Sequence, residues 1–314
     1  MLSKLPTPFM KSARQCNFDL EELRKIKAPY LYVVSNKTTA SSQIPGVIIK
    51  TQDLKEGVKL KLVVKKGTKI EKPIFLCFGV LLEKGNQEIF PEIILEEGAE
   101  AIILAHCTFP QAKEVSHRMT AKINLKKNAR LIYREKHYHG EDFGVKVLAN
   151  FNIVVEEGAV FENEFVLDQG SVGELDIIFA AELAKDSLAQ VFTRIIGKGK
   201  KDRVEIKDKI LLDGENSRSL MKFKGAIRGG GQMFFRGEML AKGKNARGHI
   251  DCQEIIVGKS IAKSIPMIEV QHPEARITHE ASVGKVNQKE LETLMTRGLS
   301  SKEATDFIIS GAIK

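Results

Sequence analysis

IILEEGAEAII at residues 93–103, INLKKNARLIY at 123–133 and IVVEEGAVFEN at 153–163 share one pattern. An aliphatic run is followed by two charged residues, Gly or Asn, a small residue and a second apolar run. Related versions are LVVKKGTKI at 62–70, ELAKDSLAQV at 182–191, LLDGENSRSL at 211–220, LAKGKNARGHI at 240–250 and VQHPEARITHE at 270–280. The residues at the turn are Gly67, Gly98, Asn128, Gly158, Asp186, Asn216, Asn245 and Glu274, at spacings of 31, 30, 30, 28, 30, 29 and 29 residues.

This period of about thirty residues predicts a mainly β fold, a parallel β-helix with its core over residues 46–284. Gly and Asn suit the turn because they tolerate a positive φ. The flanking segments are short, rich in Val and Ile, and partly alternating, which is typical of strands. No amphipathic helix is evident between Val58 and Pro273. A propeller or a sandwich would have longer or less even periods.

The two ends of the chain differ from this core. Residues 1–45 are expected to form an N-terminal segment with a short helix near 20–26. Residues 285–314 are expected to form two helices. The first ends at a Gly298 C-cap, and a Ser300–Glu303 capping box begins the second. Such a tail either caps the solenoid or docks a partner.

The composition limits which classes of function are expected. Of 314 residues, 43% are apolar and 28% charged, which is ordinary for a globular protein. There is no run of about 18 apolar residues and no signal-peptide pattern, so no membrane partner and a cytoplasmic location are expected. The formal charge is +9, but Trp is absent and aromatics are only 6%. Nucleic acid is therefore not an expected partner.

Four cysteines, Cys16, Cys77, Cys107 and Cys252, occur without a CxxC pair. This spacing excludes a zinc site of the C-x₂-C type. Isolated cysteines are usually small buried hydrophobic residues. We therefore expect Cys16 and Cys77 to be small buried hydrophobic residues.

Cys107 lies nine residues after Gly98, and His137 lies nine after Asn128. Equal offsets from the turn place two residues in one column on adjacent coils, so their side chains are expected to be close. His106 and His139 are auxiliary candidates in the same stretches. A thiolate beside an imidazole suits a soft metal, or it lowers the pKa of the thiol. The alternative is coincidental stacking of buried side chains.

A second cluster is expected one coil from the end of the solenoid. Asp251 and Glu280 share offset six, and Cys252 and His279 differ by two positions. Thiolate, imidazole and carboxylate together fit iron or another transition metal better than magnesium. The alternative is a polar coil end whose groups satisfy one another.

Several motifs resemble the SufB/SufD family of iron–sulfur cluster assembly proteins. They are Pro266–Val270, His279-Glu280-Ala281, Arg297-Gly298, and the HCTFP segment at 106–110. The resemblance runs from about Leu60 to the end and is strongest after Arg203.

Gly258-Lys259-Ser260 is not a phosphate-binding loop, because Gln253 stands where that loop requires Gly. An ATPase would therefore have to be a separate chain.

The resemblance implies a right-handed parallel β-helix, a transient iron–sulfur cluster and a tail that docks a SufC-type ATPase. It implies that Cys107 accepts sulfur from a donor, and that Cys252 and Glu280 are cluster ligands. His279 stands where SufD contributes a histidine. Apo iron–sulfur proteins would be recipients, and a reduced flavin is a further candidate that the sequence does not reveal. The expected contacts of the tail with its partner are Leu291, Leu294, Arg297, Phe307 and Ile308.

The chain is shorter than bacterial SufB, and it combines SufB-like Cys252 and Glu280 with a SufD-like HEASVGKV ending. We therefore expect a homodimer, or a pair with a SufB/SufD paralogue, acting as a scaffold and not as an enzyme. A β-helical enzyme acting on polysaccharides is one alternative; it would need a carboxylate-lined groove and no cysteines. A structural SufD-like subunit that binds no cluster is another.

Overall fold

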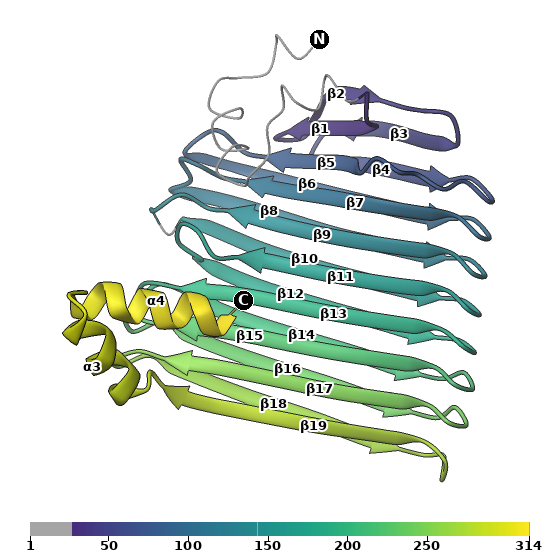
Figure 1. Cartoon of the computed structure of the whole chain (residues 1–314). Coiled ribbons are helices and arrows are strands. Elements are labelled where there is room, and N and C mark those ends of the chain that lie inside the picture. The colour runs from purple at the N-terminus through teal and green to yellow at the C-terminus, as the bar shows by residue number, and fades with distance from the viewer. Residues whose placement is uncertain (1–26, 143, 314) are drawn as a thin grey trace.

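The computed structural model describes residues 27–142 and 144–313. It is a parallel β-solenoid of about eight turns with two helices at the C-terminus, and 61% of it is strand (Figure 1). The predicted fold class is confirmed. The short helix expected near residues 20–26, and Cys16, lie outside the described residues. No helix in the described part of the chain is long and apolar enough to cross a membrane.

Each coil adds one strand to each of two sheets. In spatial order, the first sheet contains β19 (Arg276–Lys285), β17 (Arg247–Ile256), β15 (Arg218–Ile227), β13 (Leu188–Gly197), β11 (Val160–Leu167), β9 (Arg130–Tyr138), β7 (Glu100–Thr108), β5 (Ile74–Gly79), β1 (Tyr30–Val34) and β2 (Lys37–Ser42). The second sheet contains β18 (Ile261–Val270), β16 (Gln232–Ala241), β14 (Arg203–Leu212), β12 (Glu174–Leu183), β10 (Val145–Val155), β8 (Glu114–Leu125), β6 (Lys84–Leu95), β4 (Gly57–Val64) and β3 (Val47–Leu54).

The two ends of the solenoid are built differently. At the N-terminal end β2 and β3 run antiparallel to their neighbours, and they complete the first and second sheets. At the C-terminal end β18 and β19 are the last strands of their sheets (Figure 1). An edge strand presents unpaired backbone groups, so this end is open to association.

Seven of the eight turn residues adopt the backbone conformation that the repeat predicts, and Glu274 is the exception. Positive φ angles of 57–68° are found at Gly67, Gly98, Asn128, Gly158, Asp186, Asn216 and Asn245. The Gly98 backbone N–H donates to Lys127 O of the next coil at 2.9 Å. The same bond recurs from Asn128 N–H to Glu157 O at 2.9 Å. These bonds hold successive turns in one column.

The charged residues before the turns alternate in sign from one coil to the next, so they form ion pairs between coils. Lys65 pairs with Glu96 at 3.1 Å, and Lys126 pairs with Glu156 at 2.6 Å. These pairs are exposed, so each contributes little to stability. Their arrangement still avoids like charges on adjacent coils. The lysines beside the turns therefore help the coils to stack on one another.

Residues at odd offsets from the turn point into the solenoid. After Gly98 these are Ala99, Ala101, Ile103, Ala105 and Cys107, each no more than 4% exposed. The alternation follows from the two-residue period of a strand. A polar residue at an odd offset is therefore placed in the interior, where it needs a polar partner.

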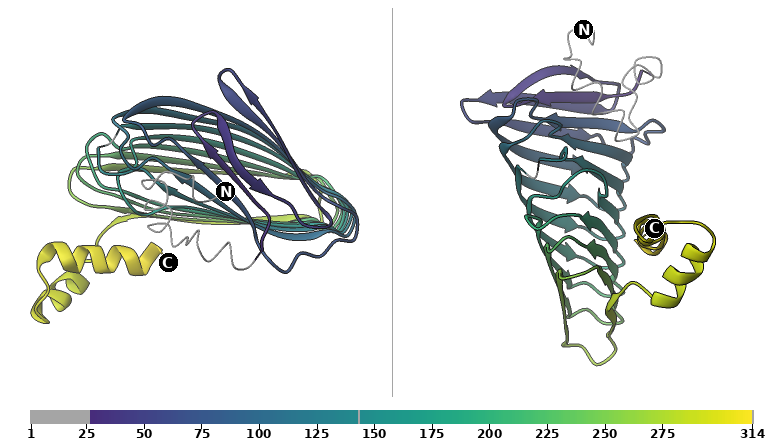
Figure 2. Two further views of the ribbon diagram at one scale, coloured as in Figure 1. Left: turned by 90° about the horizontal axis from the view of Figure 1, so that it is seen from above. Right: turned by 90° about the vertical axis from the view of Figure 1, so that its left-hand side faces the viewer.

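The C-terminal tail lies against the outer face of the first sheet (Figure 2). In α4 (Ser301–Ile313), Ile309 and Ile313 pack on Ala226 and Ile255. Next to α4 lies α3 (Gln288–Thr296).

Both predicted caps of the tail are present. Gly298, with φ of 96°, follows α3. Ser300 Oγ and Glu303 Oε2 lie 2.6 Å apart at the start of α4, and the Glu303 N–H donates back to Ser300 Oγ at 3.3 Å. The first helix therefore ends, and the second begins, where the sequence signals predict.

Candidate functional site

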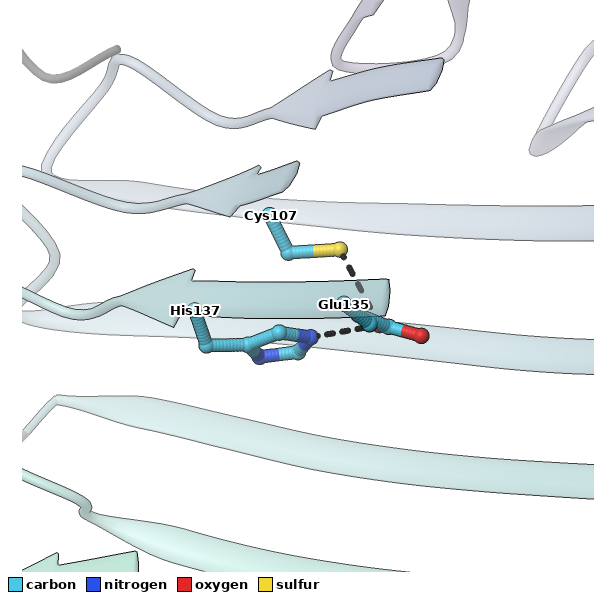
Figure 3. Close-up of side chains that lie close together, drawn as sticks. All are labelled: Cys107, Glu135 and His137. Atoms are coloured by element: carbon cyan, nitrogen blue, oxygen red, sulfur yellow. Dashed lines mark hydrogen bonds and ion pairs between the residues drawn. The ribbon is translucent and has the colours of Figure 1, made fainter. Parts of the chain in front are cut away.

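Cys107 and His137 lie opposite each other on β7 and β9, as their equal offsets predict. Both side chains point into the solenoid, and they are 0% and 1% exposed. Figure 3 shows them facing a third side chain, Glu135, which comes from the same strand as His137. The interior at this level is therefore polar.

Cys107, Glu135 and His137 form the one group of His, Cys, Asp and Glu in the described part of the chain whose ligand atoms could hold a metal ion. Their ligand atoms all lie within 4.8 Å of one another. Cys107 Sγ is 3.6 Å from Glu135 Oε1, and His137 Nε2 is 2.7 Å from the same oxygen (Figure 3). Tyr133 donates to the other oxygen, Oε2, at 3.2 Å.

The sequence interpretation missed Glu135. Its signal is the odd offset of seven from Asn128, which places a carboxylate in the interior. The sequence interpretation did not ask which face of the strand the residue occupied.

A chain of hydrogen bonds orients the His137 ring. His139 Nδ1 lies 2.8 Å from the Val172 carbonyl oxygen, which can only accept, so this nitrogen carries a proton. Burial lowers the pKa of His139 to about 3, so its ring is neutral and its Nε2 accepts. His137 Nδ1 lies 3.1 Å from that Nε2 and therefore donates to it. His137 Nε2 is then the nitrogen that faces Glu135.

His117 on β8 approaches Cys107 from the second sheet. Its Nε2 is 3.7 Å from Cys107 Sγ, and its Nδ1 is 2.9 Å from Gln87 Oε1. Gln87 Nε2 donates to two backbone carbonyls, which fixes the amide with Oε1 toward His117. Burial holds the pKa of His117 well below its usual value, so the ring is neutral with Nδ1 protonated. Its Nε2 lone pair therefore points toward the Cys107 sulfur.

His106, an auxiliary candidate, is not part of this interior group. Its even offset of eight turns it to the outer face, where it lines a cavity of about 500 Å³ beside Arg134, Lys136 and Ile313. His139, the other auxiliary residue of this stretch, is interior and contacts His137.

The second cluster is in the predicted register, because Asp251 and Glu280 are opposite on β17 and β19. Cys252 is interior and 1% exposed, and burial raises the pKa of its thiol. Glu280 is exposed and, like Asp251, lies on the outer face. Cys252 Sγ contacts only the backbone oxygen of Glu280, at 3.6 Å. Within one chain, the Cys252 sulfur and the Glu280 carboxylate are thus on opposite faces.

His279 is opposite Ile250, whose side chain is interior, so His279 occupies the inner face of the last coil. It is exposed because no further coil covers it. The sequence interpretation missed Glu254, two residues from Cys252 on the inner face. Glu254 is 1% exposed, and burial raises the pKa of its carboxyl to about 7.

The two interior clusters occupy the same part of the first sheet. On successive strands of the first sheet, Glu135 pairs with Phe165, Phe165 with Thr193, Thr193 with Phe223, and Phe223 with Cys252. β7 and β17 are five strands apart, which at about 4.8 Å per strand is about 24 Å. Cys107 and Cys252 of one chain therefore cannot bind one small cluster together.

In the tail, Leu294, Phe307 and Ile308 line a groove of about 650 Å³ between α3 and α4. Phe307 is 63% exposed. Leu291 is half-buried, and Arg297 is the exposed C-cap of α3. Three of the five predicted partner contacts thus share one apolar surface.

A comparison with protein families matches residues 85–312 to the SufBD core domain of the SUF system for iron–sulfur cluster assembly. An iron–sulfur cluster assembly SufBD family protein of Methanocaldococcus jannaschii is 36% identical over 293 residues, 93% of this chain and 92% of the relative. One from Pyrococcus horikoshii is 29% identical over 283 residues, 90% and 86% of the two chains. One from Staphylococcus aureus is 29% identical over 271 residues, which cover 81% of this chain and 54% of the relative.

Proposed function

Because the chain belongs to the SufBD family of iron–sulfur cluster assembly proteins, we propose that it is a non-enzymatic scaffold on which a transient cluster is built. The supporting observation is the pair of interior thiols, Cys107 and Cys252, each with a carboxylate on the same inner face. Thiolate, carboxylate and imidazole ligands together suit iron.

We assign sulfur acceptance to Cys107. Attack of its thiolate on a persulfide donor would form an S–S bond on Cys107, break the S–S bond of the donor and release the donor as a thiol. No oxidant is needed for this exchange. Cys107 is 0% exposed, so the reaction requires the adjoining turns to open.

We assign cluster binding to the open C-terminal end. Cys252 and His279 occupy its inner face, whereas Glu280 lies outside. A second copy, or a SufB/SufD paralogue, joined at this end could bring Glu280 or His279 of one chain to Cys252 of the other. This requirement favours a dimeric scaffold.

We assign the groove between α3 and α4 to a SufC-type ATPase. One face of α4 is occupied by the solenoid through Ile309 and Ile313, while Phe307 and Ile308 face the groove. Exposed apolar surface of this kind is typical of protein interfaces.

The rival β-helical polysaccharide enzyme requires carboxylates that are free to act in an outer groove. The outer carboxylates Glu92, Glu96, Glu156 and Glu164 instead pair with lysine or arginine of an adjacent coil. This pairing favours the scaffold over the rival. The iron and sulfide content of the purified chain tests the third candidate, a structural subunit that binds no cluster.

The dimer is expected to form through apolar side chains that the last coil leaves uncovered. Ile268, Val270 and Val283 lie on the inner face of the open end and are 41%, 44% and 45% exposed. Light scattering of the chain is expected to give twice its mass of 35.0 kDa. Val283→Lys should give a monomer. Ile261→Lys, a change of a 51% exposed residue on the outer face, should leave the dimer intact. A monomeric wild type, with and without the ATPase, would contradict the assignment.

The scaffold function is tested by anaerobic purification with the co-expressed ATPase, followed by iron and sulfide analysis and absorption spectroscopy. The wild type is expected to carry iron and sulfide. Cys107→Ser should lose sulfide-dependent assembly and still bind iron. Cys77→Ser is the matched control, because Cys77 is equally buried but packs in a separate apolar cluster with Tyr32 and Phe75. Cluster-free wild type would support the purely structural subunit instead.

A further inference from the structure

We propose that Cys107, Glu135 and His137 bind one divalent transition-metal ion inside the solenoid. This site is separate from cluster binding at the open end. It does not depend on whether Cys107 accepts sulfur. A bound ion would hold Cys107 as a thiolate.

The spacing of the ligand atoms fits a tetrahedral ion. Metal–sulfur and metal–nitrogen bonds of 2.3 and 2.0 Å place neighbouring ligand atoms about 3.5 Å apart. Cys107 Sγ lies 3.6 Å from Glu135 Oε1 and 3.7 Å from His117 Nε2. The 2.7 Å contact of His137 Nε2 with Glu135 Oε1 would have to lengthen by about 0.6 Å, because two metal bonds of ~2.0 Å at a tetrahedral angle place their ligand atoms ~3.3 Å apart. Little movement is therefore needed to admit the ion.

The hydrogen bonds behind the ligands point to the same chemistry. Val172 O and His139 hold the His137 ring so that its Nε2 is directed at Glu135. Gln87, which two backbone carbonyls hold in place, leaves the lone pair of His117 Nε2 directed at Cys107. His137 Nε2 and Glu135 Oε1 lie 2.7 Å apart, within hydrogen-bond distance. Either a proton or a metal ion lies between them.

Metal-binding histidines in proteins are oriented in this way, with the second ring nitrogen bonded to a carboxylate, carbonyl or similar acceptor. Tyr133 plays the corresponding part for Glu135 through its second oxygen. Phe109 and Phe165 pack against the rings of His117 and His137. Sulfur and nitrogen ligands with one carboxylate favour iron, zinc or cobalt over magnesium or calcium.

The test is made on the full chain in a Cys252→Ser background, without the ATPase, so that the thiol at the open end cannot contribute. Protein is produced in cobalt-supplemented medium, which lets the ion enter during folding, and is purified anaerobically. We expect one cobalt per chain and a sulfur-to-cobalt charge-transfer band. A further Cys107→Ser change should remove the band, and Glu135→Gln or His137→Gln should remove the ion.

His106→Gln is the matched control, because His106 adjoins Cys107 but faces outward; it should keep the ion and the band. His139→Gln removes no ligand, yet it should weaken cobalt binding about 10- to 100-fold by releasing the His137 ring. Thermal unfolding of each variant establishes that it folds. A folded parent chain without cobalt, or cobalt and band unchanged in folded Cys107→Ser and His137→Gln variants, would overturn the proposal. Cluster loss in the ATPase experiment alone would leave this result unaffected.

Discussion

Cys252→Ser is expected to abolish the cluster when the chain is purified anaerobically with a co-expressed SufC-type ATPase, the proposed partner. Serine preserves the volume but not the thiolate, which is the soft ligand that iron–sulfur chemistry requires. Loss of an outer-shell partner alone costs about 10- to 100-fold in metal affinity. Loss of the ligand should therefore lower iron and sulfide content by more than about tenfold, measured by chemical analysis and absorption.

Cys252→Ser and Cys107→Ser are expected to differ in a second measurement. Cys107→Ser should still retain iron, because Cys252 lies about 24 Å away at the open end. Cys77→Ser, which alters another buried thiol, should match the wild type in both iron and sulfide. If Cys252→Ser and Cys107→Ser both keep wild-type cluster content, neither assignment can stand.

Phe307→Asp is expected to separate the chain from the proposed SufC-type ATPase. Phe307 is 63% exposed and lines the groove between α3 and α4, so a charge there would be buried in the complex. Aromatic anchors of this kind are worth about 2 kcal/mol or more, which is at least about 30-fold in affinity. Titration calorimetry or co-purification measures the effect.

The matched control is Ile178→Asp, the same kind of change at a 40% exposed residue of β12 in the second sheet. It should leave the affinity unchanged. Deletion of residues 287–314 should also abolish binding while the β-rich circular dichroism remains. An ATPase that binds Phe307→Asp and the deleted chain as tightly as wild type would exclude the tail from the interface.

The sequence by itself determined that the chain folds as a solenoid and at which residues its coils turn. A period near thirty residues leaves room for two strands and two turns, and a residue that tolerates positive φ must stand where each coil turns sharply. The structure confirms this at Gly98, Asn128 and Asn245. The caps at Gly298 and Ser300 are equally local, since each is a bond between residues a few positions apart.

The pairing of Cys107 with His137 was also predictable, because equal offsets from a turn become adjacent positions in a parallel sheet. So was the register of Asp251 with Glu280. Whether the offset is odd or even also says which face of the strand a residue occupies, and Cys252 is at an odd offset whereas Glu280 is at an even one. The expectation that Cys252 and Glu280 share one site in a chain therefore took no account of the alternation that separates them.

Only the tertiary structure decided which polar groups meet inside the solenoid. His117 reaches Cys107 from the other sheet, and Gln87 and Val172 fix the ring nitrogens of His117 and His139. These contacts depend on how far apart the two sheets stand and how each side chain turns. The packing of neighbouring side chains sets both, and the spacing of residues along one strand does not encode them.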